Sequence, residues 1–182
     1  MTIFFILVSV FIVIAIIKKG VPTLTAHWNT LLDEFSFSTK EFYNLLETEL
    51  QSHGISKVNI VQKNISIGNA LSGRRLYLRV KWKQYTYDCC CAPFGKGTFI
   101  SWYLFTEKTG FELLVSKIPF VGNYLVQTFF PVTYYSIDTS SMFLTYAQSS
   151  VLKVINDITN EKGVRSLSES ERKPIMKNIF KR

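Results

Sequence analysis

Residues 75–83 read RLYLRVKWK, and their side chains alternate between polar and apolar at every step. Leu76, Leu78, Val80 and Trp82 share one side of an extended chain. Because successive side chains of a strand point to opposite faces, this period of two predicts a strand with one buried and one solvated face. The stretch therefore predicts an antiparallel sheet whose outer face meets water.

The flanking sequence completes a predicted three-stranded antiparallel meander. Weaker alternation over residues 58–63 gives the first strand. The second strand, 75–83, is expected to continue through residues 85–87 toward three consecutive cysteines. The turn sequence PFGKG at residues 93–97 then leads into a third strand at 98–106.

Two helices are predicted to flank this sheet. Ser38-Thr39-Lys40-Glu41 has the form of a capping box, followed by an apolar helical face and a terminating Gly54. The second and longer helix is expected to begin at Asp138 or Thr139 and to end near Lys162. The chain is therefore predicted to be an α+β protein.

Three further segments have weaker patterns. Apolar residues at helical spacing predict a short helix over residues 25–35. The aromatic-rich segment 110–137 either packs on the sheet as core or lies on a membrane surface, and core packing is the preferred interpretation. In the tail, Ser168 and Glu171 are expected to cap a last short helix that is interrupted at Pro174.

Residues 2–17 (TIFFILVSVFIVIAII) contain no charge, glycine or proline, which predicts a membrane-spanning helix. At about 1.5 Å per residue, sixteen residues cover roughly 24 Å, slightly less than a bilayer core. No basic residue precedes the run and no small-residue cleavage site follows it, so an uncleaved signal anchor is favoured over a cleaved signal peptide.

The charges around this anchor predict a single-pass membrane protein whose C-terminal domain faces the cytoplasm. Lys18 and Lys19 follow the apolar run directly, and basic flanks stay on the cytoplasmic side. Trp28 is assigned either to the membrane interface or to the domain core. The three cysteines, Cys89 to Cys91, are adjacent and odd in number, which also fits a reducing compartment.

The expected organisation is a transmembrane anchor (1–19), a connector (20–37), a cytoplasmic α+β domain (38–163) and a basic tail (164–182). With 182 residues and a formal net charge of +8, the chain is neither a long multidomain enzyme nor an acidic disordered protein. The cysteine triplet lacks the paired spacing of a zinc site, and Gly95-Lys96-Gly97-Thr98 fails the P-loop pattern. No cofactor or metal site and no catalytic motif is expected.

The candidate binding site is the polar face of the central strand, where cations alternate with rings. Cations attract phosphates and anionic headgroups, while rings stack on bases or lie among headgroups. An ordinary solvated sheet face explains the same pattern. The residues of this basic strand face are Arg75, Tyr77, Arg79, Lys81 and Lys83.

These features predict a membrane-anchored cytoplasmic adaptor, not an enzyme. Its partners would be the lipid bilayer and its anionic headgroups, together with a protein partner or further copies of the chain, since short anchors favour oligomers. A nucleic acid partner is not expected. Two alternatives remain open: a membrane-perturbing effector that inserts residues 111–137 and the tail, and a sensor that binds a nucleotide or phosphorylated ligand on the basic strand face.

Overall fold

The computed structural model describes residues 20–66 and 73–177, so the predicted anchor with Lys18 and Lys19 lies outside the described residues. Within these ranges the chain has an α+β fold with six strands and four helices. The elements are β1 (Val21–Leu32), α2 (Thr39–Ser52), β2 (Asn59–Ser66), β3 (Arg74–Trp82), β4 (Tyr85–Phe94), β5 (Gly97–Lys108), α3 (Gly110–Ser116), α4 (Gly122–Phe129), α5 (Tyr134–Glu161) and β6 (Ile175–Met176).

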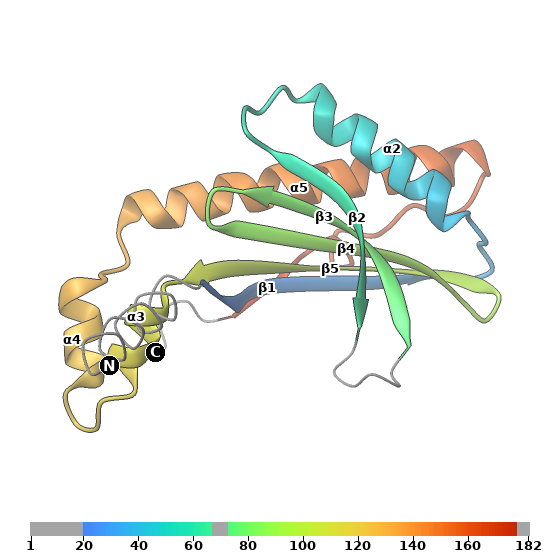
Figure 1. Ribbon diagram of the computed structural model, residues 1–182. Helices are drawn as coiled ribbons and strands as arrows, with labels where there is room; N and C mark the ends of the chain where they lie inside the picture. Colours follow the sequence, from blue (N-terminus) through green and yellow to red (C-terminus); the bar gives the residue numbers. More distant parts are fainter. Residues whose placement is uncertain (1–19, 67–72, 178–182) are drawn as a thin grey trace, which may run out of the picture.

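The strands form one antiparallel sheet in the order β2-β3-β4-β5-β1-β6 (Figure 1). Its four consecutive strands β2 to β5 make a meander, one strand more than predicted. The difference arises at Lys83 and Gln84, where the chain turns instead of continuing as one strand. Neither residue is a typical hairpin residue, and Lys83 adopts a left-handed φ of 52° there.

The prediction of a helix over residues 25–35 is wrong, because residues 21–32 form β1. This strand pairs with β5 from Val21 opposite Lys108 to Leu32 opposite Thr98. Its buried side chains alternate, in keeping with a strand period: Ala26, Trp28, Thr30 and Leu32. A small residue and a threonine occupy two of these four positions, so the apolar pattern of the sequence is incomplete.

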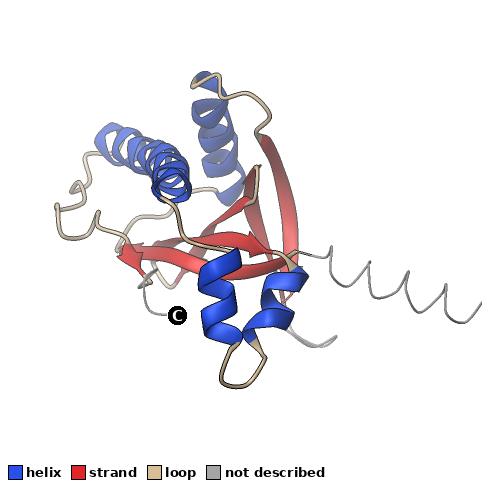
Figure 2. Ribbon diagram, turned by 90° about the vertical axis from the view of Figure 1, so that its left-hand side faces the viewer, coloured by secondary structure: helices blue, strands red, loops and turns tan. Residues whose placement is uncertain are grey.

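Helices α2 and α5 cover one face of the sheet and enclose the core against it (Figure 2). The N-terminus of α2 is the predicted one: Ser38 Oγ accepts a hydrogen bond from the Glu41 amide at 3.4 Å, and Gly54 follows the helix with a φ of 63°. The predicted apolar stripe of α5 is buried throughout. Its members are Phe143, Ala147, Val151, Val154, Ile155 and Ile158.

Helix α5 begins earlier than predicted, at Tyr134 and not after Asp138. Its cap is Thr133, whose hydroxyl accepts from the Ser136 amide at 3.2 Å, while Ser136 Oγ accepts from the Thr133 amide at 3.1 Å. This reciprocal pair satisfies two amides at the helix start. Gly163, with a φ of 65°, follows the helix at its other end as expected.

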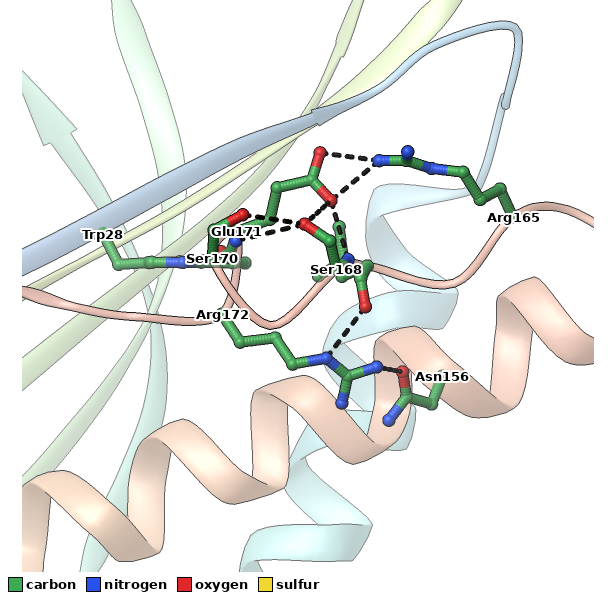
Figure 3. A network of polar contacts seen from close by, with 8 residues as sticks. Trp28, Asn156, Arg165, Ser168, Ser170, Glu171 and Arg172 are labelled. Atoms are coloured by element: carbon green, nitrogen blue, oxygen red, sulfur yellow. Dashed lines mark hydrogen bonds and ion pairs between the residues drawn. The ribbon is translucent and has the colours of Figure 1, made fainter.

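Residues 164–177 form a strap that returns from the end of α5 to β1 (Figure 3). Ser168 and Glu171 pair as a capping box would, since the Ser168 amide donates to Glu171 Oε2 at 2.7 Å. Arg165 also contacts both carboxylate oxygens at 2.8 Å. No helix follows, however: the predicted short helix is absent from the described residues, which instead form β6 and pair with β1 at Ala26 and His27.

Candidate functional site

The basic strand face is less basic than the sequence of β3 suggests. Arg79 makes a bidentate ion pair with the buried Asp88 of β4, with two nitrogen–oxygen distances of 2.7 Å. Hydrogen bonding to Asp88 raises the pKa of Arg79. Lys81 pairs with Glu107 of β5 at 3.1 Å. Two of the predicted cations are therefore ion-paired with carboxylates from β4 and β5.

The remaining members of this face differ in position. Lys83 lies in the β3–β4 turn, and its Nζ sits 4.4 Å from the centroid of the Trp82 ring as a cation–π contact. Arg75 is exposed, and Tyr77 is half-buried with its pKa raised mainly by burial. What the structure brings together on the outer face of the sheet is thus Arg75, Tyr77 and the Arg79–Asp88 pair.

Trp28 lies in the core and not at a surface. Its side chain is 3% exposed, and its Nε1 donates to the backbone oxygen of Glu171 in the strap at 2.6 Å. Of the two assignments considered for Trp28, core packing is therefore the observed one.

The three cysteines are buried in β4, as predicted. Burial raises the pKa of all three thiols, for Cys91 to about 12. The thiolate is the form that attacks electrophiles and binds metals, so these cysteines are poor nucleophiles at neutral pH. Within residues 20–66 and 73–177, no group of three or more His, Cys, Asp or Glu side chains is arranged to hold a metal ion.

One cluster has the residue types of a catalytic triad but not its geometry. Ser150 Oγ lies 3.4 Å from His53 Nε2, and Glu49 Oε1 lies 3.2 Å from the same nitrogen. In a triad the serine and the acid contact different ring nitrogens. Ser150 is also fully buried and donates to the Tyr146 carbonyl at 2.9 Å. The cluster links α2 to α5 and leaves no nucleophile accessible.

The most distinctive surface is formed by residues 110–137, and the expectation that they are core is wrong. They form α3, α4 and the start of α5, beyond the end of the sheet (Figure 1). None of them belongs to the main apolar core. The large apolar and aromatic side chains that this segment exposes are Phe111, Leu114, Ile118, Phe120, Val121, Tyr124, Phe129, Val132, Tyr134 and Tyr135, and the exposed Met142 follows in α5.

A cavity of about 490 Å³ opens at the same end of the molecule. Its walls come from the start of β1, the β3–β4 turn, the end of β5, the α4–α5 connection and the first turns of α5. Its polar lining includes the hydroxyl groups of Thr25 and Thr106, whose Oγ1 atoms are 2.8 Å apart. Its charged side chains balance, with Glu107 and Glu112 against Lys108 and Lys177.

None of the described helices combines the length and apolar character needed to cross a bilayer. The apolar run 2–17 is not among them, and the anchor stays a prediction. Composition alone does not separate the two interpretations of residues 110–137, because an apolar segment has the same composition in a core and on an exposed surface.

Comparisons with known proteins assign no family to the chain. No protein-family model and no curated protein matches it. Among solved structures, it is similar to the protein TTHA0849 from Thermus thermophilus, with 14% identity over 70% of this chain and 97% of that chain and a TM-score of 0.24. A likeness at this level assigns neither a fold family nor a function.

Proposed function

We propose that the chain is a membrane-anchored, non-enzymatic interaction module whose domain is held directly against the cytoplasmic surface of the bilayer. The apolar run ends at Ile17, and the paired strand β1 begins at Val21. Four residue steps span at most about 14 Å when fully extended. A domain attached in this way has no flexible linker on which to reach away from the membrane.

The proposal rests on one structural observation above all. Val21 pairs with Lys108 at the end of the sheet where α3 and α4 lie, so the exposed aromatic segment and the attachment point of the predicted anchor share one end of the molecule. In the sequence, Lys18 and Lys19 stand between the apolar run and β1, and Lys117 directly follows α3. Basic side chains next to a membrane segment attract anionic headgroups.

We propose that the outer face of the sheet around Tyr77 is the surface that contacts a protein partner or a second copy of the chain. Arg79 and Lys81 are already ion-paired, so aromatic contact supplies more of the binding than free positive charge does. Tyrosine suits this role because it offers a large ring with a polar tip. The same ion pairs weigh against the nucleotide sensor, since a bound phosphate would have to compete with Asp88 for Arg79.

The anchoring is tested with the full chain in membrane vesicles from an expression host. A Lys96→Cys variant places an exposed thiol in the β4–β5 turn, whereas the three native thiols are buried. We expect the protein to stay in the membrane pellet at alkaline pH. We also expect a membrane-impermeant maleimide to label it in inverted vesicles but not in right-side-out vesicles. Release at alkaline pH, or labelling from the outside, contradicts the proposal.

The partner surface is tested separately with a photo-crosslinking side chain at Tyr77 and a control at Asn44, an exposed position on α2. We expect adducts in intact membranes from position 77 and none from position 44. Equal yields at both positions would remove the outer face as the partner surface while leaving the anchoring intact.

The membrane-perturbing effector stays a second candidate, because the exposed segment 110–137 also suits insertion into lipid. Dye-filled anionic vesicles distinguish the two functions. An adaptor leaves the vesicles sealed when the full chain is added, whereas an effector releases the dye.

A further inference from the structure

The start of the described chain, its end and the α3–α4 pair all lie at one end of the sheet. Val21 of β1 is opposite Lys108, and α3 begins two residues later at Gly110. At the other terminus, the Lys177 amide donates to the Thr25 carbonyl at 2.9 Å. The described chain therefore begins beside α3 and α4 (Figure 1), and an anchor of the kind proposed above would join the domain there.

The connection between α3 and α4, residues 117–121, forms an apolar tip. Ile118, Phe120 and Val121 are exposed, and Phe120 has no neighbour that shields its ring. Its φ of 66° lies in the left-handed region, which bulky residues avoid. The backbone thus adopts an unfavourable conformation at the residue with the largest exposed fraction among the exposed apolar side chains, and such outliers cluster at functional sites.

The tip is carried by a rigidly packed pair of helices and not by a loose loop. Gly122 is buried, and a Cβ atom there would lie 2.7 Å from the Val115 carbonyl oxygen, so α3 and α4 approach closely only because this residue is glycine. The Gly122 amide donates to the Ile118 carbonyl at 2.9 Å, and the Val121 amide donates to the Pro119 carbonyl at 2.8 Å. The backbone that carries the exposed side chains is therefore well defined.

We propose that the α3–α4 tip inserts into the headgroup–acyl boundary of the bilayer and gives the domain a second lipid contact beside its anchor. This inference rests on the anchoring proposed above. Residues 110–137 contain one cation, Lys117, and one carboxylate, Glu112, which is paired with Lys108 at 3.2 Å, so the segment presents little negative charge to an anionic surface. Phenylalanine and tyrosine rings are the side chains that favour this depth of the membrane.

The test uses the full chain in vesicles and thiol-specific labelling with an environment-sensitive fluorophore. Reporter variants are Phe120→Cys and Phe129→Cys, and the control is Phe94→Cys. Phe94 and Phe129 are both 68% exposed, but Phe94 lies at the β4–β5 turn. Strand β5 has 12 residues, so its two ends are about 36 Å apart. Because the native cysteines are buried, the label reports on the introduced site.

We expect lipids with nitroxide groups near the headgroup to quench the reporters at 120 and 129 several-fold more than the one at 94. The variant Phe120→Gly, made with the reporter at 129, should lose most of this quenching. Its thermal stability should be unchanged or raised, because glycine tolerates the left-handed backbone. Loss of lipid contact in this variant therefore cannot be attributed to unfolding.

Three results are decisive. If the chain floats with the vesicles but the reporters at 120 and 129 are quenched no more than the one at 94, this inference is overturned and the anchoring stands. A reporter that is shielded from water yet insensitive to lipid nitroxides shows that protein covers the tip, either a second copy or residues 2–17, and overturns it too. If the chain does not float, the anchoring itself fails.

Discussion

Among substitutions of a core tyrosine by phenylalanine, Tyr43→Phe should destabilise the protein most. The backbone ladder between β3 and β4 ends at Leu78 and Cys89. Beyond this point the Tyr43 hydroxyl joins the two strands, donating to the Leu76 carbonyl at 2.8 Å and accepting from the Cys91 amide at 3.0 Å. Tyr43 comes from α2, so one oxygen atom connects a helix to two strands.

The cost of Tyr43→Phe follows from the two groups that lose their partner. An unsatisfied buried amide or carbonyl costs about 1–3 kcal/mol, and Tyr43 is fully buried, so water does not readily replace the hydroxyl. We expect the free energy of unfolding to fall by about 3 kcal/mol. For a protein of this size, such a loss lowers the melting temperature by about 6–12 °C.

Tyr146→Phe is the matched control, because the Tyr146 hydroxyl makes one hydrogen bond to the protein, to the Leu50 carbonyl at 2.8 Å. Its loss should cost about 1 kcal/mol. Both variants are compared with the native chain by urea unfolding in mild detergent, and hydrogen exchange follows the Cys91 amide. If Tyr43→Phe costs no more than Tyr146→Phe, or the Cys91 amide stays protected, the bridging role assigned to Tyr43 is wrong.

Three further predictions concern pH, the helix pair and the strap. Burial raises the pKa of Cys91 from 9.0 to about 12. The contribution of this thiol to the free energy of unfolding is therefore complete below pH 9 and is lost as the pH rises toward 12, by about 1.4 kcal/mol per pH unit. The difference between the urea midpoints at pH 8 and pH 10.5 should be smaller in Cys91→Ala than in the native chain. Gly122→Ala should force α3 and α4 apart and speed proteolysis between residues 117 and 121, while the α5 amides keep their protection from exchange. Glu171→Ala should loosen the turn within the strap, because Ser168 and Arg165 both lose this carboxylate as a partner, and should shift tryptophan emission to longer wavelength as Trp28 meets water. An unshifted spectrum would contradict the contribution of this carboxylate.

Sequence patterns predicted the parts of this fold that depend on near neighbours in the chain. The alternation in β3, the Ser38 cap of α2 and the apolar stripe of α5 each arise from residues of a single helix or a single strand. β1 was not predicted in this way because its identity depends on β5, about 66 to 87 residues further along the chain, whose backbone supplies its hydrogen bonds. Ala26 and Thr30 are buried by that pairing and not by their own hydrophobicity.

The core packing predicted for residues 110–137 is not observed for a different reason: several segments compete for the same sheet face. The inner face of the sheet is already covered by α2 and α5, and the core residues of those helices fill it. The outer face carries Arg75, Arg79 and Lys81, so a further apolar segment finds no apolar sheet face to cover and lies at the end of the sheet with its rings exposed. Whether an apolar segment becomes core thus depends on how many other segments compete for the same sheet face, which no local pattern records.

The candidate binding site shows the same limit for charge. Counting cations along β3 predicts a strongly basic face, but the carboxylates that neutralise it belong to other strands: Asp88 on β4 faces Arg79, and Glu107 on β5 reaches Lys81. In a sheet, the potential of a face is set by cross-strand neighbours as much as by residues two positions apart. Asp88→Asn is therefore a gain-of-charge variant. It should leave Arg79 free to attract anions, so that inorganic phosphate raises the melting temperature of Asp88→Asn but not of the native chain; a native chain that responds equally would restore the basic face as an anion site.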